Sequence, residues 1–304
     1  MKNAVKNNVC PVCSSNSTRL ISIYRSNRPF LSVDNLCKCD LCELVYCHPL
    51  PSDSELNDYY EGGLYYDIVS DPADKSFTDF SYKIAKSRLS LILRKVELSD
   101  EARVLDIGAG NGQFGRALKE ISSETEYYAL DPDPKCINSW GEWVDRKHGK
   151  LNEIERNSID LVVMNQVLEH VTSPIEFIET IKGLLRLGGY LYTDVPNGDH
   201  RFKPTLEPHT LFFSITSLSR AVELAAMEMI YCDTAGMKIP RARTFFGHSI
   251  GSNQKLMLNP WKMHRRVNSV LRRIGVNLDE FSLFQSDRYG GDRNWIRCIA
   301  RRID

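Results

Sequence analysis

Short apolar runs alternate with segments of helical spacing through the middle of the chain. The apolar runs are typical of buried strands, and the segments between them place apolar residues three or four positions apart. Strands are expected at 104–107 and 127–131 and within 159–171 and 185–197, with a helix over 114–121. Because strands that alternate with helices form parallel sheets, the pattern predicts an α/β fold.

A second helix is expected between the last two of these strands. Ser173 and Glu176 have the spacing of a capping box, and Pro174 occupies the first helical position. Apolar residues then continue along one face to Leu185, and the pair Gly188-Gly189 is expected to end the helix.

A glycine-rich connection follows the first strand. Gly108, Gly110 and Gly112 stand on it, and glycine lets the backbone approach a ligand closely. The dinucleotide pattern G-x-G-x-x-G does not fit, because Gln113 occupies the position of its third glycine. Asp106 precedes the loop, and its carboxylate would repel a pyrophosphate but suits a cationic ligand.

An acidic residue also ends the next apolar strand. Asp131 stands there, and a carboxylate in this position suits the two hydroxyls of a ribose. S-adenosylmethionine has both a cationic part and a ribose. The glycine connection resembles the first motif, D-x-G-x-G-x-G, of the class I S-adenosylmethionine-dependent methyltransferases, and the resemblance continues through 159–171 and 185–197. It implies a Rossmann-like, seven-stranded methyltransferase sheet.

The same resemblance implies roles for single residues. The glycine loop would contact the methionine end of S-adenosylmethionine, and Asp131 would bind its ribose. Pro132 would flank the adenine, and Asn165 and Gln166 would lie beside the sulfonium. The implied cofactor residues are therefore Asp106, Gly108, Gly110, Gly112, Asp131, Pro132, Asn165 and Gln166.

Further elements are expected around this core. A helix over 82–96, with Leu89, Ile92 and Leu93 in its buried stripe, would cover the cofactor as a lid. Another helix lies within 214–227, and the last two strands are expected at 229–233 and 295–301. The family joins those last two strands directly, whereas here a long insertion separates them, so it should carry structure and a purpose. The predicted division is a zinc knuckle at 1–50, linker and lid helices at 51–100, the core at 101–235, an insertion at 236–290 that is a candidate for acceptor binding, and the final strand at 291–304.

Cysteines are concentrated near the N-terminus. Two C-x-x-C pairs suit tetrahedral zinc, whose thiolate ligands converge from two turns. The expected ligands are Cys10, Cys13, Cys39 and Cys42. Cys37, Cys47 and His48 remain possible replacements for one ligand, and a set of free thiols or a redox pair is the alternative interpretation.

The knuckle has a family resemblance of its own. Its C-x-x-C pairs, the following Leu44-Val45-Tyr46 and the tyrosine pairs at 59–60 and 65–66 resemble methyltransferases with an N-terminal zinc-binding domain. That group includes sugar methyltransferases of bacterial glycan and antibiotic pathways. Glu43 stands where the group usually has glycine, so the turn must tolerate a side chain.

Composition narrows the possible partners. The 304 residues include 39 Lys plus Arg and 39 Asp plus Glu, so the chain has no electrostatic bias toward nucleic acid. The N-terminal segment lacks the apolar core of a signal peptide, and a cytoplasmic protein is expected. Residues 261–274 have the pattern of a basic amphipathic helix. It is either an ordinary solvated face or a site for a phosphate or for peripheral contact with an anionic membrane.

Methyl transfer to an alcohol or amine requires removal of a proton, and a base beside the methyl group raises the rate about a hundredfold or more. His209 is the first candidate, because it follows the fifth strand and lies in a proline-containing loop. A histidine that only hydrogen-bonds its loop is the alternative. His170 and Glu169 are second candidates, for which a structural role is favoured.

These patterns favour a methyltransferase that acts on a small molecule. The expected acceptor is a sugar hydroxyl or a sugar-linked group, carried by a sugar nucleotide or another precursor of a surface glycan. Three alternatives remain: C-methylation of a keto-sugar nucleotide, methylation of RNA with the knuckle as a nucleic-acid reader, and a non-catalytic S-adenosylmethionine-binding protein.

Overall fold

The computed structural model describes residues 8–27, 30–61, 75–238 and 293–304. Most of the expected insertion, the basic helix expected at 261–274 and the tyrosine pair at 65–66 lie outside the described residues. Among the described helices, none has the length and apolar character needed to cross a bilayer.

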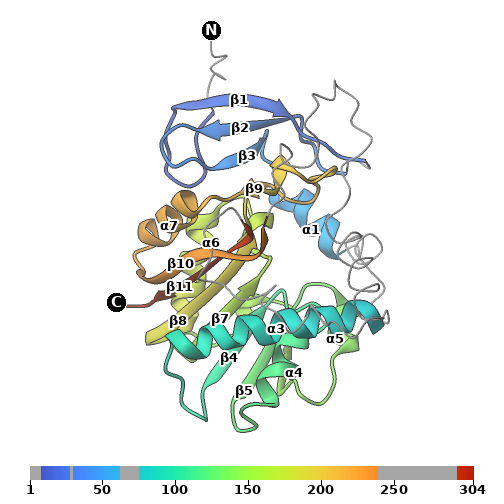
Figure 1. Cartoon of the computed structure of the whole chain (residues 1–304), viewed down its shortest axis with the longest axis vertical. Helices are drawn as coiled ribbons and strands as arrows, with labels where there is room; N and C mark the ends of the chain where they lie inside the picture. The colour runs from blue at the N-terminus through green and yellow to red at the C-terminus, as the bar shows by residue number, and fades with distance from the viewer. Residues whose placement is uncertain (1–7, 28–29, 62–74, 239–292) are drawn as a thin grey trace.

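A seven-stranded sheet forms the centre of the molecule (Figure 1). Its strands lie in the order β10-β11-β8-β7-β4-β5-β6, and all are parallel except β11, which pairs antiparallel with both neighbours. The strands are β4 (Arg103–Ile107), β5 (Glu126–Leu130), β6 (Arg146–His148), β7 (Ile159–Asn165), β8 (Leu185–Pro196), β10 (Glu228–Lys238) and β11 (Arg293–Arg301).

The strand order reverses beside β4. From β4 the chain moves to β5 and β6 on one side, and then returns to β7 and β8 on the other. In open parallel sheets, ligands bind at such a switch point, outside the carboxyl ends of the strands. The connections after β4 and β7 therefore meet where a ligand is expected.

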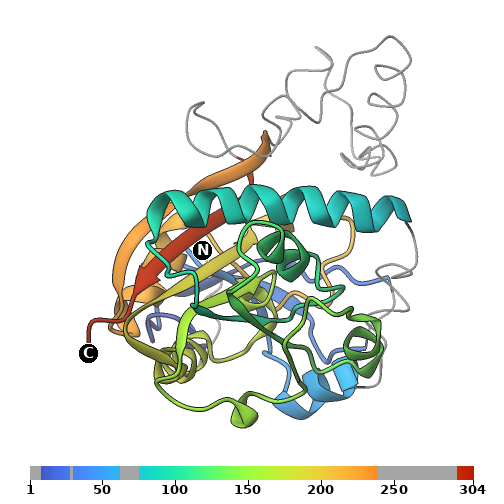
Figure 2. The same ribbon diagram turned by 90° about the horizontal axis from the view of Figure 1, so that it is seen from below.

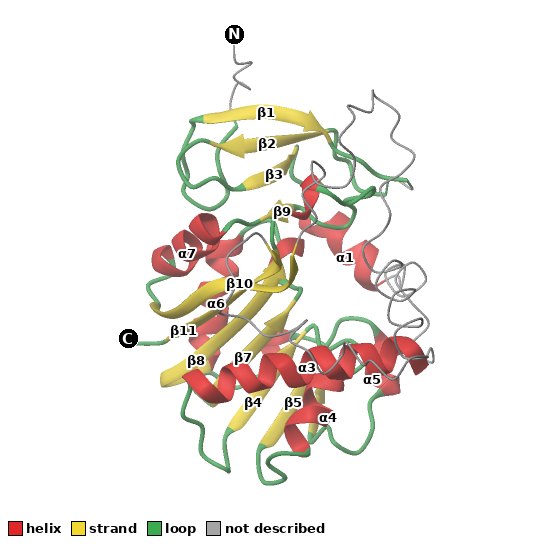
Figure 3. Ribbon diagram, viewed as in Figure 1, coloured by secondary structure: helices red, strands yellow, loops and turns green. Residues whose placement is uncertain are grey.

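Helices cover both faces of the sheet (Figures 2 and 3). One face carries α3 (Lys75–Lys95), α4 (Gln113–Lys119) and α5 (Pro134–Ser139), and the other carries α6 (Pro174–Leu184) and α7 (Ile215–Leu224). Alternate residues of β4 supply the two cores, with Val104 facing the first group and Leu105 and Ile107 facing the second. The expectation of an α/β fold with a Rossmann-like, seven-stranded sheet is confirmed.

Two predicted packing details are wrong. Leu93 is exposed on α3, and Leu91 is buried in its place, because α3 turns a slightly different face to the sheet. Ile121 is exposed because α4 ends at Lys119.

The ends of α6 also differ from the prediction. Ser173 is its N-cap, but no side-chain hydrogen bond completes the expected capping box with Glu176. The helix ends at Leu184, before the glycine pair, because Leu185 takes an extended conformation and begins β8. A capping box occurs instead at α7, where Ser214 and Ser217 bond reciprocally.

A smaller, four-stranded sheet stands above the carboxyl edge of the large one (Figure 1). Its order is β1-β2-β3-β9, with β1 (Thr18–Ile23), β2 (Asn35–Cys39), β3 (Val45–His48) and β9 (Leu211–Phe212). The fourth strand comes from the core part of the chain, which the sequence did not indicate. Helix α1 (Asp53–Glu61) follows β3 and carries the first tyrosine pair.

Candidate functional site

The connection between β4 and α4 forms a tight loop. Its three glycines have φ between 54° and 68°, a backbone region that residues with a side chain rarely adopt. They are Gly108, Gly110 and Gly112. The amide of Gly108 donates to the Leu130 carbonyl at 2.8 Å, which fixes the loop against the end of β5. A Cβ on Gly108 would lie 2.7 Å from Val167, so the glycine permits close contact with the connection after β7.

Asp131 anchors this loop from the end of β5. One carboxylate oxygen accepts the amide of Gly110 and the other accepts the amide of Asp133, both at 3.0 Å. Burial raises the pKa of Asp131, and the two amide donors oppose the shift. The neighbouring Pro132 is exposed at the same edge.

Asp106 lies almost fully buried on β4. Its Oδ2 accepts the Tyr127 hydroxyl at 2.7 Å, whereas its Oδ1 and the Oδ1 of Asn165 have no hydrogen-bond partner among the described residues. Burial raises the pKa of Asp106 to about 7, against the opposing effects of Tyr127 and Arg88. Buried acceptors without donors are rare in folded proteins, so these two oxygens suit the ammonium group of an amino acid.

The side chain and the backbone amide of Gln166 are both hydrogen-bonded to Asp194. Its side-chain nitrogen donates to Asp194 Oδ1 at 2.7 Å, and its backbone amide donates to the Asp194 carbonyl at 2.8 Å. The other oxygen of Asp194 pairs with Arg88 at 3.0 Å and with Arg297 at 3.1 Å. This buried network positions the β7 connection. The sequence did not indicate it, because the three charged residues lie far apart in the chain.

Two tryptophans after α5 also contact the glycine loop. The Trp140 indole donates to the Gly110 carbonyl at 2.7 Å. A Cβ on Gly112 would lie 3.1 Å from Trp140 and 3.3 Å from Trp143. Neither tryptophan was predicted to contact the loop, because Trp140 and Gly110 are 30 residues apart in the chain and no motif links them.

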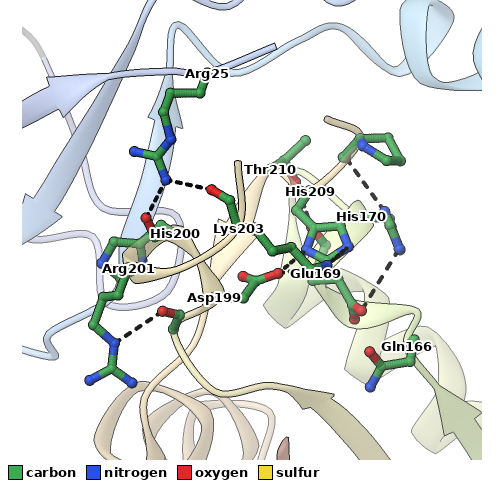
Figure 4. Close-up of polar contacts among 12 residues, drawn as sticks. Arg25, Gln166, Glu169, His170, Asp199, His200, Arg201, Lys203, His209 and Thr210 are labelled. Carbon is green, nitrogen blue, oxygen red and sulfur yellow. Dashed lines mark hydrogen bonds and ion pairs between the residues drawn. The ribbon is translucent and has the colours of Figure 1, made fainter. Parts of the chain in front are cut away.

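A buried polar cluster lies on the segment before β9 (Figure 4). His209 Nδ1 lies 2.9 Å from Asp199 Oδ2, and its Nε2 lies 3.4 Å from Lys203 Nζ. Burial lowers the pKa of His209, and Asp199 opposes that shift. Burial alone would raise the pKa of Asp199, but His209 and Lys203 outweigh it and lower the value. The predicted His209 therefore has an acidic partner that the sequence did not reveal.

His170 and Glu169 complete this cluster from the connection after β7. The ring centres of His170 and His209 are 4.8 Å apart, and His170 Nε2 lies 3.8 Å from Glu169 Oε1. Burial lowers the pKa of His170 and raises that of Glu169, so the neutral forms of both are favoured. Neither oxygen of Glu169 has a hydrogen-bond partner among the described residues.

The cluster has some features of a cation site. The ligand atoms of Glu169, His170 and His209 lie within 4.8 Å of one another. However, the ammonium of Lys203 stands beside the Nε2 that His209 would offer. A second cation there would be repelled, so the arrangement is better suited to proton transfer.

The predicted cysteine ligands lie together at the turns of the small sheet. Cys10 and Cys42 have sulfurs 3.5 Å apart, as do Cys13 and Cys39, and all four sulfurs lie within 4.8 Å of one another. A zinc tetrahedron with bonds of about 2.3 Å has edges of about 3.8 Å, which this spacing fits. A hydrogen bond from Cys42 lowers the pKa of Cys10 to about 5, which favours a thiolate. Cys37, Cys47 and His48 are not part of this group.

Comparison with known proteins now identifies the family. Residues 79–245 match a sequence profile described as a methyltransferase domain, and this is more than half of the chain. The chain belongs to the class I S-adenosylmethionine-dependent methyltransferases. The resemblance seen in the sequence is thereby confirmed for the core.

Curated relatives of the chain include ubiquinone biosynthesis O-methyltransferases. That of Xanthomonas euvesicatoria is 24% identical over 156 residues, which are 41% of this chain and 64% of the relative. That of Xanthomonas campestris is 24% identical over 187 residues, which are 49% of this chain and 71% of the relative. The match to the first thus spans less than two thirds of its length.

Two solved structures show the same methyltransferase fold. One is in the complex between the Trm112 methyltransferase activator of Haloferax volcanii and a methyltransferase, with TM-score 0.50, 13% identity, and coverage of 74% of this chain and 92% of that chain. The other is phosphoethanolamine N-methyltransferase 2 of Haemonchus contortus in complex with S-adenosyl-L-methionine. It has TM-score 0.50, 14% identity, and coverage of 86% of this chain and 62% of that chain.

Proposed function

We propose that this methyltransferase moves the methyl group of S-adenosylmethionine to an oxygen of a small-molecule acceptor, with His209 as the base. The observation that carries the proposal is the buried pair of His209 and Asp199, 2.9 Å apart, at the edge of the sheet where the glycine loop lies. A neutral imidazole oriented by a carboxylate is the arrangement that a general base needs.

The donor would bind at the switch point of the sheet. Asp106 and Asn165 offer buried oxygens without partners to its ammonium group, and the glycine loop lets its amino-acid part approach the backbone. Asp131 would hold the ribose, and the exposed Pro132 would lie beside the adenine. Gln166 would act indirectly, through its bonds to Asp194.

When bound, the donor supplies a methyl group that is already activated on a sulfonium. The acceptor oxygen forms its bond to that methyl carbon as the carbon–sulfur bond breaks, and the bonding pair stays on sulfur. His209 faces Asp199 through Nδ1, so its Nε2 would take the acceptor's proton. Lys203 stands 3.4 Å from that nitrogen and would have to move aside, where its charge would favour an oxyanion.

Oxygen as the accepting atom is favoured by the relatives, which are named O-methyltransferases. A sugar hydroxyl of a glycan precursor is proposed from the resemblance of the N-terminal knuckle to sugar methyltransferases. C-methylation of a keto-sugar nucleotide would use the same base to remove a proton beside the carbonyl.

We also propose that Cys10, Cys13, Cys39 and Cys42 bind one structural zinc ion. The spacing of their sulfurs supports it, and a closed set of four thiolates leaves no open position for catalysis. The measurement is zinc content by mass spectrometry of the purified protein. One zinc per chain that is lost in Cys42→Ser supports the proposal, and a metal-free wild type that keeps full stability contradicts it.

The proposed function is tested first by calorimetry with S-adenosylmethionine and then by methyl uptake from the labelled donor into a panel of nucleotide sugars. We expect micromolar donor binding and release of S-adenosylhomocysteine with an accepted sugar. His209→Gln should lower turnover about a hundredfold with donor affinity unchanged. His200→Gln, which changes a histidine of the same segment, is the matched control. Full turnover in His209→Gln would exclude the base role, and donor binding without turnover on any acceptor would favour a silent binding protein.

A further inference from the structure

The small sheet and the acid–base cluster are joined by the chain itself. Strand β9 pairs with β3 through Val45 opposite Phe212 and Tyr46 opposite Leu211. His209 and Thr210 immediately precede β9, and the Cys47 amide donates to the Thr210 carbonyl at 2.9 Å. The last residues of the cluster are therefore bonded directly to the knuckle.

Apolar packing fixes β9 from both sides. Leu211 lies in a core that also contains Leu44 and the zinc-ligand cysteines, whereas Phe212 lies in a second core with Tyr24 and Leu206. Leu44, Leu211, Phe212, Tyr24 and Leu206 are all buried. Since the two cores enclose β9, the knuckle cannot shift without moving the residues before β9.

Tyr24 contacts His209 itself. Its hydroxyl donates to the His209 carbonyl at 3.0 Å, from the end of β1. Burial raises the pKa of Tyr24, so the hydroxyl stays protonated and remains a donor at any working pH. No other side chain of the described knuckle is seen to bond the His209 backbone.

The rest of the segment is bonded to the knuckle as well. The Arg25 guanidinium donates to the Lys203 carbonyl at 2.9 Å and to the His200 carbonyl, and the Arg25 carbonyl accepts the Leu206 amide at 2.8 Å (Figure 4). The carboxylate of Glu207 accepts the Leu31 amide at 3.0 Å. The segment from 199 to 210 is therefore hydrogen-bonded to the knuckle both before and after His209.

We propose that Tyr24 is a positioning residue for the reaction and that the zinc-loaded knuckle is a wall of the active site rather than an appended module. The proposal rests on the proposed function, because it assigns to the knuckle the task of holding His209. Small displacements of a catalytic group reduce rates strongly, so a single lost anchor should be measurable.

The first test compares Tyr24→Phe with Tyr46→Phe. Both variants remove one hydroxyl from a buried tyrosine of the knuckle, but only Tyr24 bonds His209. We expect Tyr24→Phe to lower kcat about tenfold, with the donor Kd unchanged. The acid limb of the plot of kcat against pH should also move up toward about pH 6.5. A loosened imidazole is better hydrated, so burial no longer lowers the pKa of His209. Equal kcat and equal pH profiles in the two variants would overturn the proposal.

A second readout needs no acceptor. The ring nitrogens of His209 can be followed by NMR in protein labelled at histidine, and the signal is assigned with His209→Gln. Tyr24→Phe should change the ring shifts and raise the pKa of His209, whereas Tyr46→Phe should not. This measurement separates the positioning role of Tyr24 from the proposed function. If Tyr24→Phe shifts the His209 ring signal in a protein that methylates no acceptor, the positioning role is supported and the proposed function fails.

The zinc is tested in the full-length protein. Cys42→Ser, or removal of zinc by a chelator, should disturb the His209 signal and lower kcat while calorimetry still shows donor binding at the glycine loop. If the variant fails to fold, Tyr24→Phe decides alone. An unchanged His209 signal in folded, zinc-free protein would contradict the role of the knuckle.

Discussion

Acidic side chains at the carboxyl edge of the sheet take different protonation states because their surroundings differ. Burial raises the pKa of Asp106 to about 7, whereas His209 and Lys203 hold that of Asp199 below its ordinary value. The sequence could predict Asp106 and Asp131, since Asp106 directly precedes the glycine loop and Asp131 ends the next apolar strand. It could not predict Asp199, which lies in a short turn without a motif and meets His209 only in the folded chain.

Changing Asp131 to alanine should weaken donor binding. The carboxylate holds the glycine loop through the Gly110 amide and the start of α5 through the Asp133 amide, and its proposed bonds to the ribose would also be lost. A hydrogen bond to a charged group contributes about 1.5–3 kcal/mol. We therefore expect the donor Kd to rise roughly 10- to 100-fold in calorimetry. Glu142→Ala removes an exposed carboxylate nearby and should leave the Kd unchanged. An unaltered Kd in Asp131→Ala would contradict the assignment of the donor site.

The pH profile should report the pair of Asp199 and His209. The pKa of His209 is lowered from its ordinary value of about 6.5, so the base is still neutral when the pH falls to that value. Turnover should therefore begin to fall only below about pH 6.5. Asp199 opposes that lowering, so Asp199→Asn should shift the acid limb to still lower pH and also reduce kcat through lost orientation. The measurement is kcat against pH for both proteins at saturating donor. An acid limb at or above pH 6.5 in the wild type would argue against His209.

At the scale of elements, the fit of α4 against β5 positions the glycine loop. Gly115 on α4 lies against the Tyr127 ring, and the Tyr127 hydroxyl bonds Asp106. The type and order of the core elements were predictable, because their apolar spacing is strong. Strand β9 was not, because two residues carry no periodicity and the pairing with β3 spans a long stretch of chain.

Gly115→Ala should therefore damage both stability and donor binding. The new Cβ would lie 2.1 Å from the Tyr127 ring, so the ring must move and take its bond to Asp106 with it. Overpacking of this kind lowers the free energy of unfolding by about 1–3 kcal/mol. Denaturant unfolding and calorimetry would measure the two effects. Gly149→Ala has its nearest contact at 3.9 Å and serves as the control, and equal behaviour of both variants would contradict this packing argument.

At the scale of the whole molecule, two sheets share one chain segment and one continuous core. The core on the α6 and α7 face of the large sheet continues into the cysteine turns of the small one. The sequence separated a knuckle at 1–50 from a core that begins near residue 100, because motifs reveal local units. It could not show that the knuckle and the core meet at β9, since packing and backbone hydrogen bonds make that contact.

The balance of charge bears on the RNA alternative. With 39 basic and 39 acidic residues, the chain should neutralise few phosphates, so its affinity for RNA should be weak and nearly independent of salt. Fluorescence anisotropy with a labelled RNA between 50 and 200 mM salt would measure this. A reader that contacts six or more phosphates would lose about a thousandfold in affinity over that range. Such a steep loss would revive the RNA alternative.

Strand β9 is synthesised long after its partner β3, which has a consequence while the chain is still on the ribosome. Strand β3 ends at His48, but its neighbour begins only at Leu211, about 160 residues later. At roughly 5–20 residues per second, the nascent knuckle waits on the order of ten to thirty seconds with an open strand edge. Unpaired edges invite association between chains, so we expect the nascent knuckle to be prone to aggregation until β9 has been synthesised.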